Sequence, residues 1–113
     1  MEKAAKAAGG EVVAREYTSD RSTDFMAILT SIKGKAPDLV FFGGMDPQAA
    51  PMIKQMKQLG MQARFLGGDG AQTPKLIELA GADAEGALAS NPGLPLDAMP
   101  GGSAFKAKFE SKY

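Results

Sequence analysis

The chain has 113 residues, with 13 basic and 13 acidic side chains, and therefore a formal net charge of zero. This length suits one compact domain over residues 1–113. A neutral chain lacks the positive field that attracts nucleic acid or an anionic membrane, so neither partner is expected. Because cysteine and histidine are absent, thiolate chemistry, histidine general bases and the usual zinc sites are excluded. We predict no cofactor and no enzyme activity.

The N-terminal segment "MEKAAKAAGG" predicts a short helix over 1–8 that ends at Gly9 and Gly10. It lacks the hydrophobic stretch of a secretory signal, and no part of the chain approaches the ~20 apolar residues that cross a bilayer. We therefore expect no spanning helix. We also expect that a natural product of this length would stay in the cytoplasm.

The next segment predicts a strand followed by a helix. Residues 11–18, "EVVAREYT", are rich in β-branched and aromatic side chains and predict a strand with one partly exposed face. Thr23 is the predicted N-cap of a helix over 24–33. Its apolar side chains recur at the spacing of one helix face: Phe25, Ile28, Leu29 and Ile32.

A second strand and helix follow. The continuous apolar run "DLVFFGG", 38–44, predicts a strand covered on both faces of a parallel sheet. Asp46 is the predicted N-cap of a helix over 47–59, because Pro47 suits a first helical position. Pro51 lacks an N–H group and is expected to loosen the first turn of that helix.

The pattern continues to the end of the chain. "ARFLGG", 63–68, predicts a strand, and Thr73 with Pro74 predicts the start of a helix that stops at Gly81. "EGALASN", 85–91, predicts a weaker strand. The residues from 92 to 102 predict a loop, followed by a helix capped by Ser103 that carries Phe105 and Phe109. The alternation predicts a three-layer α/β fold, with a mostly parallel sheet flanked by helices.

Two Gly-Gly pairs, 43–44 and 67–68, end neighbouring strands of the predicted sheet. Ligands of open α/β sheets bind at the carboxyl ends of the strands, so these loops should share one rim. Glycine lets a backbone approach a ligand closely or adopt positive φ, and free N–H groups at a helix start bind a carboxylate. The Asp69 carboxylate would suit an ammonium group. The predicted ligand residues are Gly44, Met45, Asp46, Gly68 and Asp69.

Structural interpretations of the same residues remain open. A Gly-Gly pair after a strand also forms a tight turn, Asp46 also serves as a helix cap, and Asp69 could stabilise its own turn. The methionines, including Met26, Met52 and Met56, are better interpreted as core residues than as a soft-metal site. Residues 67–74 lack the lysine of a phosphate-binding loop, and no G-x-G-x-x-G follows either strand.

Three consecutive stretches carry a resemblance: "STDFMAILTSIKGKAPDLVFFGG", "DPQAAPMIKQMKQLGMQARFLGGDG" and "LIELAGADAEGALAS". Over about residues 9–113 the chain resembles the second lobe of the periplasmic branched-chain amino acid-binding proteins. These are the type I, Rossmann-like solute receptors of ABC importers. The resemblance implies a non-catalytic periplasmic receptor that closes on an amino acid and presents it to a membrane permease. Asp69 matches the acidic residue that helps hold the ligand's ammonium group.

Met45 stands where some family members place an aromatic residue. A thioether offers apolar contact without a hydroxyl donor. The implied solute is therefore a branched-chain, aromatic or other apolar amino acid, or a small carboxylate. A chain that supplies one wall of the cleft should bind it weakly, because the opposing wall provides much of the burial.

The family's sheet order, 2-1-3-4-5, implies that the first strand of the lobe, which would lie between 11–18 and 38–44, is missing here. Right-handed crossovers should place the helices 24–33, 47–59 and 74–80 on one face of the sheet. The opposite face would then be largely bare, which is unstable in water for a monomer. We predict a homodimer or a strand-exchanged oligomer.

Two other functions remain open. A flavodoxin-like phosphoacceptor or enzyme domain would need two or three carboxylates converging beside a lysine, and the strand ends supply only Asp46 and Asp69. A self-associating fragment with no ligand is the other alternative. Titration with amino acids distinguishes the receptor from this fragment.

Overall fold

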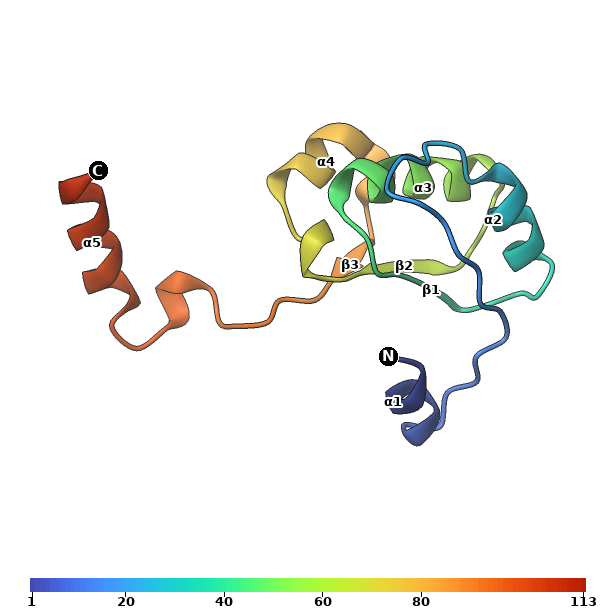
Figure 1. Cartoon of the computed structure of the whole chain (residues 1–113), viewed down its shortest axis with the longest axis horizontal. Helices are drawn as coiled ribbons and strands as arrows, with labels where there is room; N and C mark the ends of the chain where they lie inside the picture. The colour runs from blue at the N-terminus through green and yellow to red at the C-terminus, as the bar shows by residue number, and fades with distance from the viewer.

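A small parallel sheet lies at the centre of the computed structural model, which describes all 113 residues (Figure 1). Its strands are β1 (Leu39–Phe42), β2 (Arg64–Gly67) and β3 (Leu88–Ala89), in the order β1-β2-β3. All pairings are parallel, with Val40 opposite Phe65 and Phe42 opposite Gly67. The predicted alternation of parallel strands and helices is confirmed.

Five α-helices accompany the sheet: α1 (Glu2–Ala7), α2 (Met26–Lys33), α3 (Asp46–Gln58), α4 (Pro74–Ala80) and α5 (Gly102–Lys112). Three short 3₁₀ turns complete the elements: η1 (Asp69–Ala71), η2 (Gly81–Ala84) and η3 (Leu96–Ala98). None of the helices combines the length and apolar character needed to cross a membrane. Helix α3 continues through Pro51 as one helix of 13 residues.

The hydrophobic core lies on one side of the sheet. Helices α2, α3 and α4 all cover that face, as right-handed crossovers require (Figure 1). Alternate strand residues, Val40 and Phe65, point into the core, where Leu29 of α2 and Ile53 of α3 are also buried. The predicted one-sided arrangement of the three helices is confirmed.

The other face of the sheet remains largely open. Leu39, Phe41 and Leu88 are 45%, 41% and 48% exposed on it. Helix α1 lies on that side without a single buried residue, and α5 projects far from the sheet on a long connection (Figure 1). The radius of gyration is 16.7 Å, whereas a compact chain of this length has about 13 Å.

The predicted strand over 11–18 is wrong. These residues form no strand, and none of the backbone hydrogen bonds of the loops and turns involves them. A strand needs a neighbour to satisfy its backbone groups, and the segment does not pair with β1, whose outer edge is therefore free. Glutamines of α3 hold the continuation of this segment instead. The Gln55 side chain accepts a hydrogen bond from the Phe25 N–H at 2.6 Å and donates one to the Thr23 carbonyl at 2.9 Å.

One predicted helix cap is confirmed, and three are wrong. The Thr73 side chain accepts from the Leu76 N–H at 3.1 Å and caps α4. Thr23 does not cap α2, which begins at Met26, and the Met26 N–H donates a hydrogen bond to the Asp24 carboxylate instead. Met45, rather than Asp46, precedes α3, and Gly101, rather than Ser103, precedes α5. In each wrong case the helix starts one or two residues away from the predicted position, so the side chain does not cap the free N–H groups.

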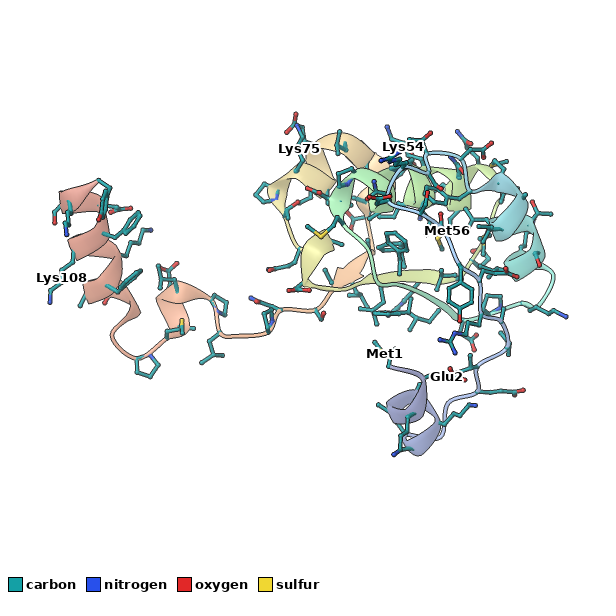
Figure 2. All side chains as sticks on the ribbon, in the orientation of Figure 1. Met1, Glu2, Lys54, Met56, Lys75 and Lys108 are labelled. Atoms are coloured by element: carbon teal, nitrogen blue, oxygen red, sulfur yellow. The ribbon has the colours of Figure 1, made fainter.

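Smaller differences concern the weak strand and one methionine. Only Leu88 and Ala89 of the predicted 85–91 strand pair with β2, because the preceding residues close the turn η2. Met52 and Met56 are core residues as predicted, whereas Met26 is 37% exposed at the start of α2. Lys54 and Lys75 point outward from α3 and α4, as solvated helix faces do (Figure 2).

The core predicts a clear difference between two apolar residues on the covering helices. Leu29 is fully buried, so Leu29→Ala leaves a cavity and should lower the free energy of unfolding by about 2–5 kcal/mol. Ile77 on α4 is 65% exposed, and Ile77→Ala should change it by less than about 0.5 kcal/mol. Urea denaturation followed by circular dichroism measures both. Equal losses for the two variants would contradict this location of the core.

Candidate functional site

The carboxyl ends of β1 and β2 bring two loops together at one edge of the sheet. The strands stop in register, with Phe42 opposite Gly67, and the Gly68 N–H donates to the Phe42 carbonyl at 3.2 Å. The chain then leaves the sheet through residues 43–45 on one side and 68–71 on the other. The predicted common rim of the two Gly-Gly loops is therefore present.

Asp69 stands exposed on this rim as the first residue of η1. The turn is held by backbone groups: the Ala71 N–H donates to the Gly68 carbonyl and the Gln72 N–H to the Asp69 carbonyl, both at 3.0 Å. No hydrogen bond or ion pair within the chain uses the Asp69 side chain, and the next helix is capped by Thr73. Its carboxylate is therefore available to a group from outside the chain.

Met45 and Asp46 occupy the neighbouring loop at the start of α3. Met45 has an extended backbone and is 59% exposed. Its sulfur lies directly against Gly70, at the position that a side chain on Gly70 would need. The Asp46 carboxylate accepts a hydrogen bond from the Thr73 hydroxyl at 2.9 Å. The two loops are thus in contact through side chains as well as through the strands.

The glycines of the rim have different physical roles. None has positive φ, so close approach rather than backbone conformation explains them. A Cβ at Gly44 would collide with the Phe42 ring, and one at Gly67 with the Ala71 methyl group. A Cβ at Gly68 would meet nothing within 4 Å. Packing within the chain therefore requires Gly44 and Gly67, whereas Gly68 faces open space.

Backbone donors on the rim are also free. Among the hydrogen bonds of the turns and loops, none is donated by the N–H groups of Gly44, Met45, Asp69 or Gly70. Unsatisfied N–H groups beside an exposed carboxylate provide donors and an acceptor on one surface. This combination suits a small molecule that carries both an acceptor group and an ammonium group.

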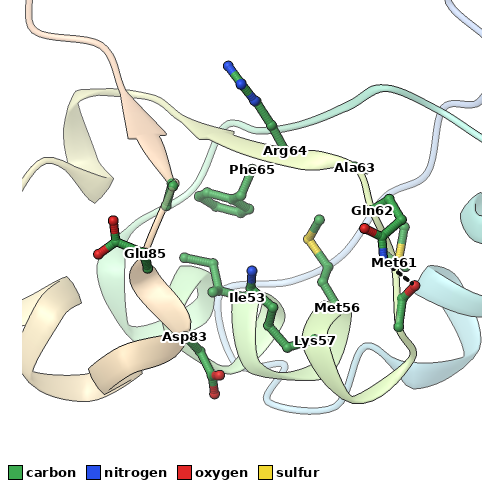
Figure 3. Close-up of a pocket in the computed structure, with 13 residues that line it drawn as sticks. Ile53, Met56, Lys57, Met61, Gln62, Ala63, Arg64, Phe65, Asp83 and Glu85 are labelled. Carbon is green, nitrogen blue, oxygen red and sulfur yellow. Dashed lines mark hydrogen bonds between the residues drawn. The ribbon is translucent and has the colours of Figure 1, made fainter.

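Two surface cavities lie away from the rim. One of about 260 Å³ lies between α3, the start of β2 and η2, with Phe65 facing Ile53 and Met56 and with Asp83 and Glu85 at one end (Figure 3). A second, of about 310 Å³, is bounded by Lys33, residues 36–38 and 60–63. None of the five predicted ligand residues lines either cavity. The predicted ligand residues therefore lie outside both of these cavities.

Sequence reasoning missed two contacts of the rim, Thr73 with Asp46 and Met45 with Gly70. The sequence pattern indicated Thr73 only as a cap and gave no role to Gly70. Each contact joins residues about 25 positions apart, so no local pattern reports it. The one available signal was that Met45 and Asp69 each follow a Gly-Gly pair at the end of one of two adjacent strands.

Comparison with known proteins identifies the family. The "Periplasmic binding protein" family matches residues 1–113. The small parallel sheet with flanking helices is the fold of the type I periplasmic binding proteins. The chain belongs to the periplasmic binding protein family.

Individual relatives are considerably longer than this chain. The leucine-, isoleucine-, valine-, threonine- and alanine-binding protein of Pseudomonas aeruginosa is 33% identical over 92 residues, which are 81% of this chain and 25% of that protein. An amino acid binding protein of the same species is 41% identical over 58 residues, or 51% of this chain and 16% of that protein. The chain thus spans a quarter or less of these curated relatives.

Solved structures share the arrangement over nearly the whole chain. A leucine-binding protein from Thermotoga maritima matches with a TM-score of 0.82 and 32% identity, covering 96% of this chain and 31% of that one. A branched-chain amino acid transporter structure from Rhodospirillum rubrum, at 24% identity, supports the fold alone, with a TM-score of 0.86 over 99% of this chain and 32% of that one. Both structures are about three times as long as this chain.

The different roles of the rim glycines lead to a stability prediction. Gly67→Ala forces a methyl group against Ala71 and should destabilise the fold by about 1–3 kcal/mol. Gly68→Ala enters open space with a φ of −72° that alanine adopts readily, so stability should be unchanged or rise by up to about 1 kcal/mol. Chemical denaturation of both variants measures the difference. A Gly68→Ala variant as unstable as Gly67→Ala would show that the rim is packed more closely than described.

Proposed function

We propose that this chain contributes one wall of the amino acid cleft in the substrate-binding component of an ABC-type importer. The exposed carboxylate of Asp69, unpaired at the carboxyl ends of two parallel strands, is the observation that carries the proposal. Family membership and the leucine- and branched-chain-binding names of its relatives support an apolar amino acid as the solute.

Each predicted residue has a distinct role in this proposal. Asp69 pairs with the ligand's ammonium group, where a charge-assisted hydrogen bond is stronger than a neutral one. Met45 offers its exposed thioether to the apolar side chain of the ligand. Gly68 faces open space and lets the ligand approach the backbone, and Gly44 offers a free N–H group. Asp46 adds the carboxylate oxygen that Thr73 does not use.

The proposed role is non-catalytic and periplasmic, and its macromolecular partner is the permease of the importer. Relatives of the chain are solute-binding proteins rather than enzymes. Because one wall buries only part of a small ligand, the chain alone should bind an amino acid with a Kd of about 1 mM or weaker. A phosphoacceptor or enzyme function has less support, since Asp46 is bonded to Thr73 and no group of three acidic residues gathers.

Removal of the Asp69 charge tests the amino acid site. Asp69→Asn should weaken L-leucine binding by about 10-fold or more, because the ammonium group loses a charged partner. Titration of the ¹⁵N-labelled chain with L-leucine, followed by NMR, should shift the amides of residues 44–46 and 68–70. Asp97→Asn, at an exposed carboxylate on η3, is the matched control and should bind as the unaltered chain does. No shift at 20 mM leucine in the unaltered chain would favour a fragment without a ligand.

We also propose that the chain forms a homodimer or strand-exchanged oligomer in which a second copy covers the open sheet face. Its accessible surface is 7996 Å², about 2,100 Å² more than a compact monomer of this mass exposes. Each partner in a standard interface contributes about 800 Å², so the excess is ample for a stable dimer. The face carries Leu39, Phe41 and Leu88, and the free β1 edge adjoins it.

The C-terminal helix supplies a further surface for the second copy. Phe105, Phe109 and Tyr113 form a continuous aromatic row on α5, with ring centroids 6.2 and 5.1 Å apart. All three are more than half exposed, and α5 buries only Gly102. Aromatic side chains that are exposed in a free chain are enriched at the centres of protein interfaces, where the partner buries them.

A charge placed on the open face should separate the copies. Phe41→Glu buries a carboxylate in the proposed interface and should weaken self-association by about 100-fold. Ile77→Glu adds the same charge on exposed α4 and is the control. Analytical ultracentrifugation from 1 to 100 µM measures both. A monomeric unaltered chain across this range would overturn the proposal.

A further inference from the structure

The two rim loops are joined by one side-chain hydrogen bond between residues 27 positions apart. The Thr73 hydroxyl lies 2.9 Å from the Asp46 carboxylate and 3.1 Å from the Leu76 nitrogen. The Leu76 N–H is a donor, so it occupies a lone pair of the hydroxyl oxygen. The single hydroxyl proton is then directed to Asp46, which as a carboxylate only accepts. One hydroxyl therefore caps α4 and ties it to the first turn of α3.

No other side-chain hydrogen bond connects the two segments that carry the rim loops. The bond from Thr73 to Asp46 is the only one that joins α3 and its preceding loop to residues 68–80. Both partners are half-buried, where water competes less for a charge-assisted bond. The bond therefore has more influence on loop position than an exposed pair would have.

The ligand residues lie immediately beside this bond. Met45 directly precedes Asp46, and its sulfur lies against Gly70, the residue after Asp69. A Cβ on Gly70 would also lie 3.2 Å from the Gly44 carbonyl oxygen. Movement of either loop would change the separation between the Met45 thioether and the Asp69 carboxylate. That separation decides which amino acid can place its side chain and its ammonium group on the rim together.

We infer that Asp46 and Thr73 are a positioning pair that fixes Asp69 and Met45 relative to each other. The inference rests on the proposed amino acid site, and it assigns to Asp46 a role through the neighbouring loop besides its contact with a ligand. Thr73 adds geometric selectivity without touching the solute. The pair sets the rim in its binding arrangement before any amino acid arrives.

Three substitutions separate positioning from capping. Asp46→Ala removes the acceptor and leaves the Thr73 cap intact. Thr73→Asp keeps a good cap for α4, but it removes the donor and places two carboxylates together. Thr73→Ser retains both hydrogen bonds and should restore the behaviour of the unaltered chain. Asp24→Ala removes a capping carboxylate at α2, remote from the rim, and is the matched control.

NMR relaxation without amino acid gives the primary readout. In Asp46→Ala and Thr73→Asp, the backbone order parameters of residues 68–70 should fall from about 0.85 to below about 0.6. Thr73→Ser and Asp24→Ala should leave them unchanged. Order parameters that stay near 0.85 in Asp46→Ala, or that fall equally in Thr73→Ser, would overturn the positioning role. A purely structural cap would predict rigid loops in Thr73→Asp.

L-leucine titration of the same variants separates failure of this inference from failure of the proposed site. If the unaltered chain binds, both disruptive variants should bind about 10-fold more weakly, while Thr73→Ser should bind normally. Equal affinity in all variants would overturn the inference and leave the site standing. Absence of leucine shifts in the unaltered chain would refute the site, whereas the order parameters still decide whether the pair holds the loops.

Discussion

The in-register parallel pairing of β1 with β2 is the constraint on which the rest of the molecule depends. Four residue pairs, from Leu39 with Arg64 to Phe42 with Gly67, fix the two strands at the same height. The chain must therefore leave both strands at the same end of the sheet, and this brings Met45 and Asp69 onto a common rim. Because side chains alternate along a strand, the same pairing turns Val40 and Phe65 together toward the helices. The pairing of β1 with β2 therefore determines the position of both the rim and the core.

One-sided packing is the second consequence of parallel topology. Right-handed crossovers carry α2, α3 and α4 to the same face, and the buried core gathers beneath them. The opposite strand residues are equally apolar: Leu39, Phe41 and Leu88 lie on a face that no helix of the chain seals. A run such as "DLVFFGG" has the composition of a strand buried on both sides. Its composition therefore requires a cover that the packing of this chain does not provide.

The sequence predicted those elements whose causes are local. Apolar periodicity located α2, α3 and α4, and Thr73 before Pro74 located the one confirmed cap. The strand over 11–18 failed because its residues suit a strand by composition, while their backbone groups do not pair with any strand of the sheet. Met26 was misplaced because a residue of the correct type stands at the first, exposed position of a helix. Strand pairing and helix starts depend on neighbours that composition does not record.

The candidate site was predictable only in part for the same reason. The Gly-Gly ends and the fold class put Asp69 and Met45 on one rim, because strand direction alone decides that. The hydrogen bond from Thr73 to Asp46 and the contact of the Met45 sulfur with Gly70 depend on how two loops meet in space. Asp46 was predicted as a cap because Pro47 suits a first helical position. The hydroxyl that bonds to Asp46 belongs to Thr73, which precedes α4 rather than α3.

The rim and the open face are separate surfaces of the same sheet, so the proposed amino acid site and the proposed self-association would not compete for the same residues. The rim follows the strand ends, whereas the open face consists of the exposed strand residues Leu39, Phe41 and Leu88. A second copy on Phe41 and Leu88 would cover the face without closing over Asp69. Self-association would then stabilise the sheet that carries the amino acid wall, because burial of one strand face restricts the pairing of β1 and β2. Ligand affinity would still be limited by the single wall, since a partner on the face adds no contact at the rim.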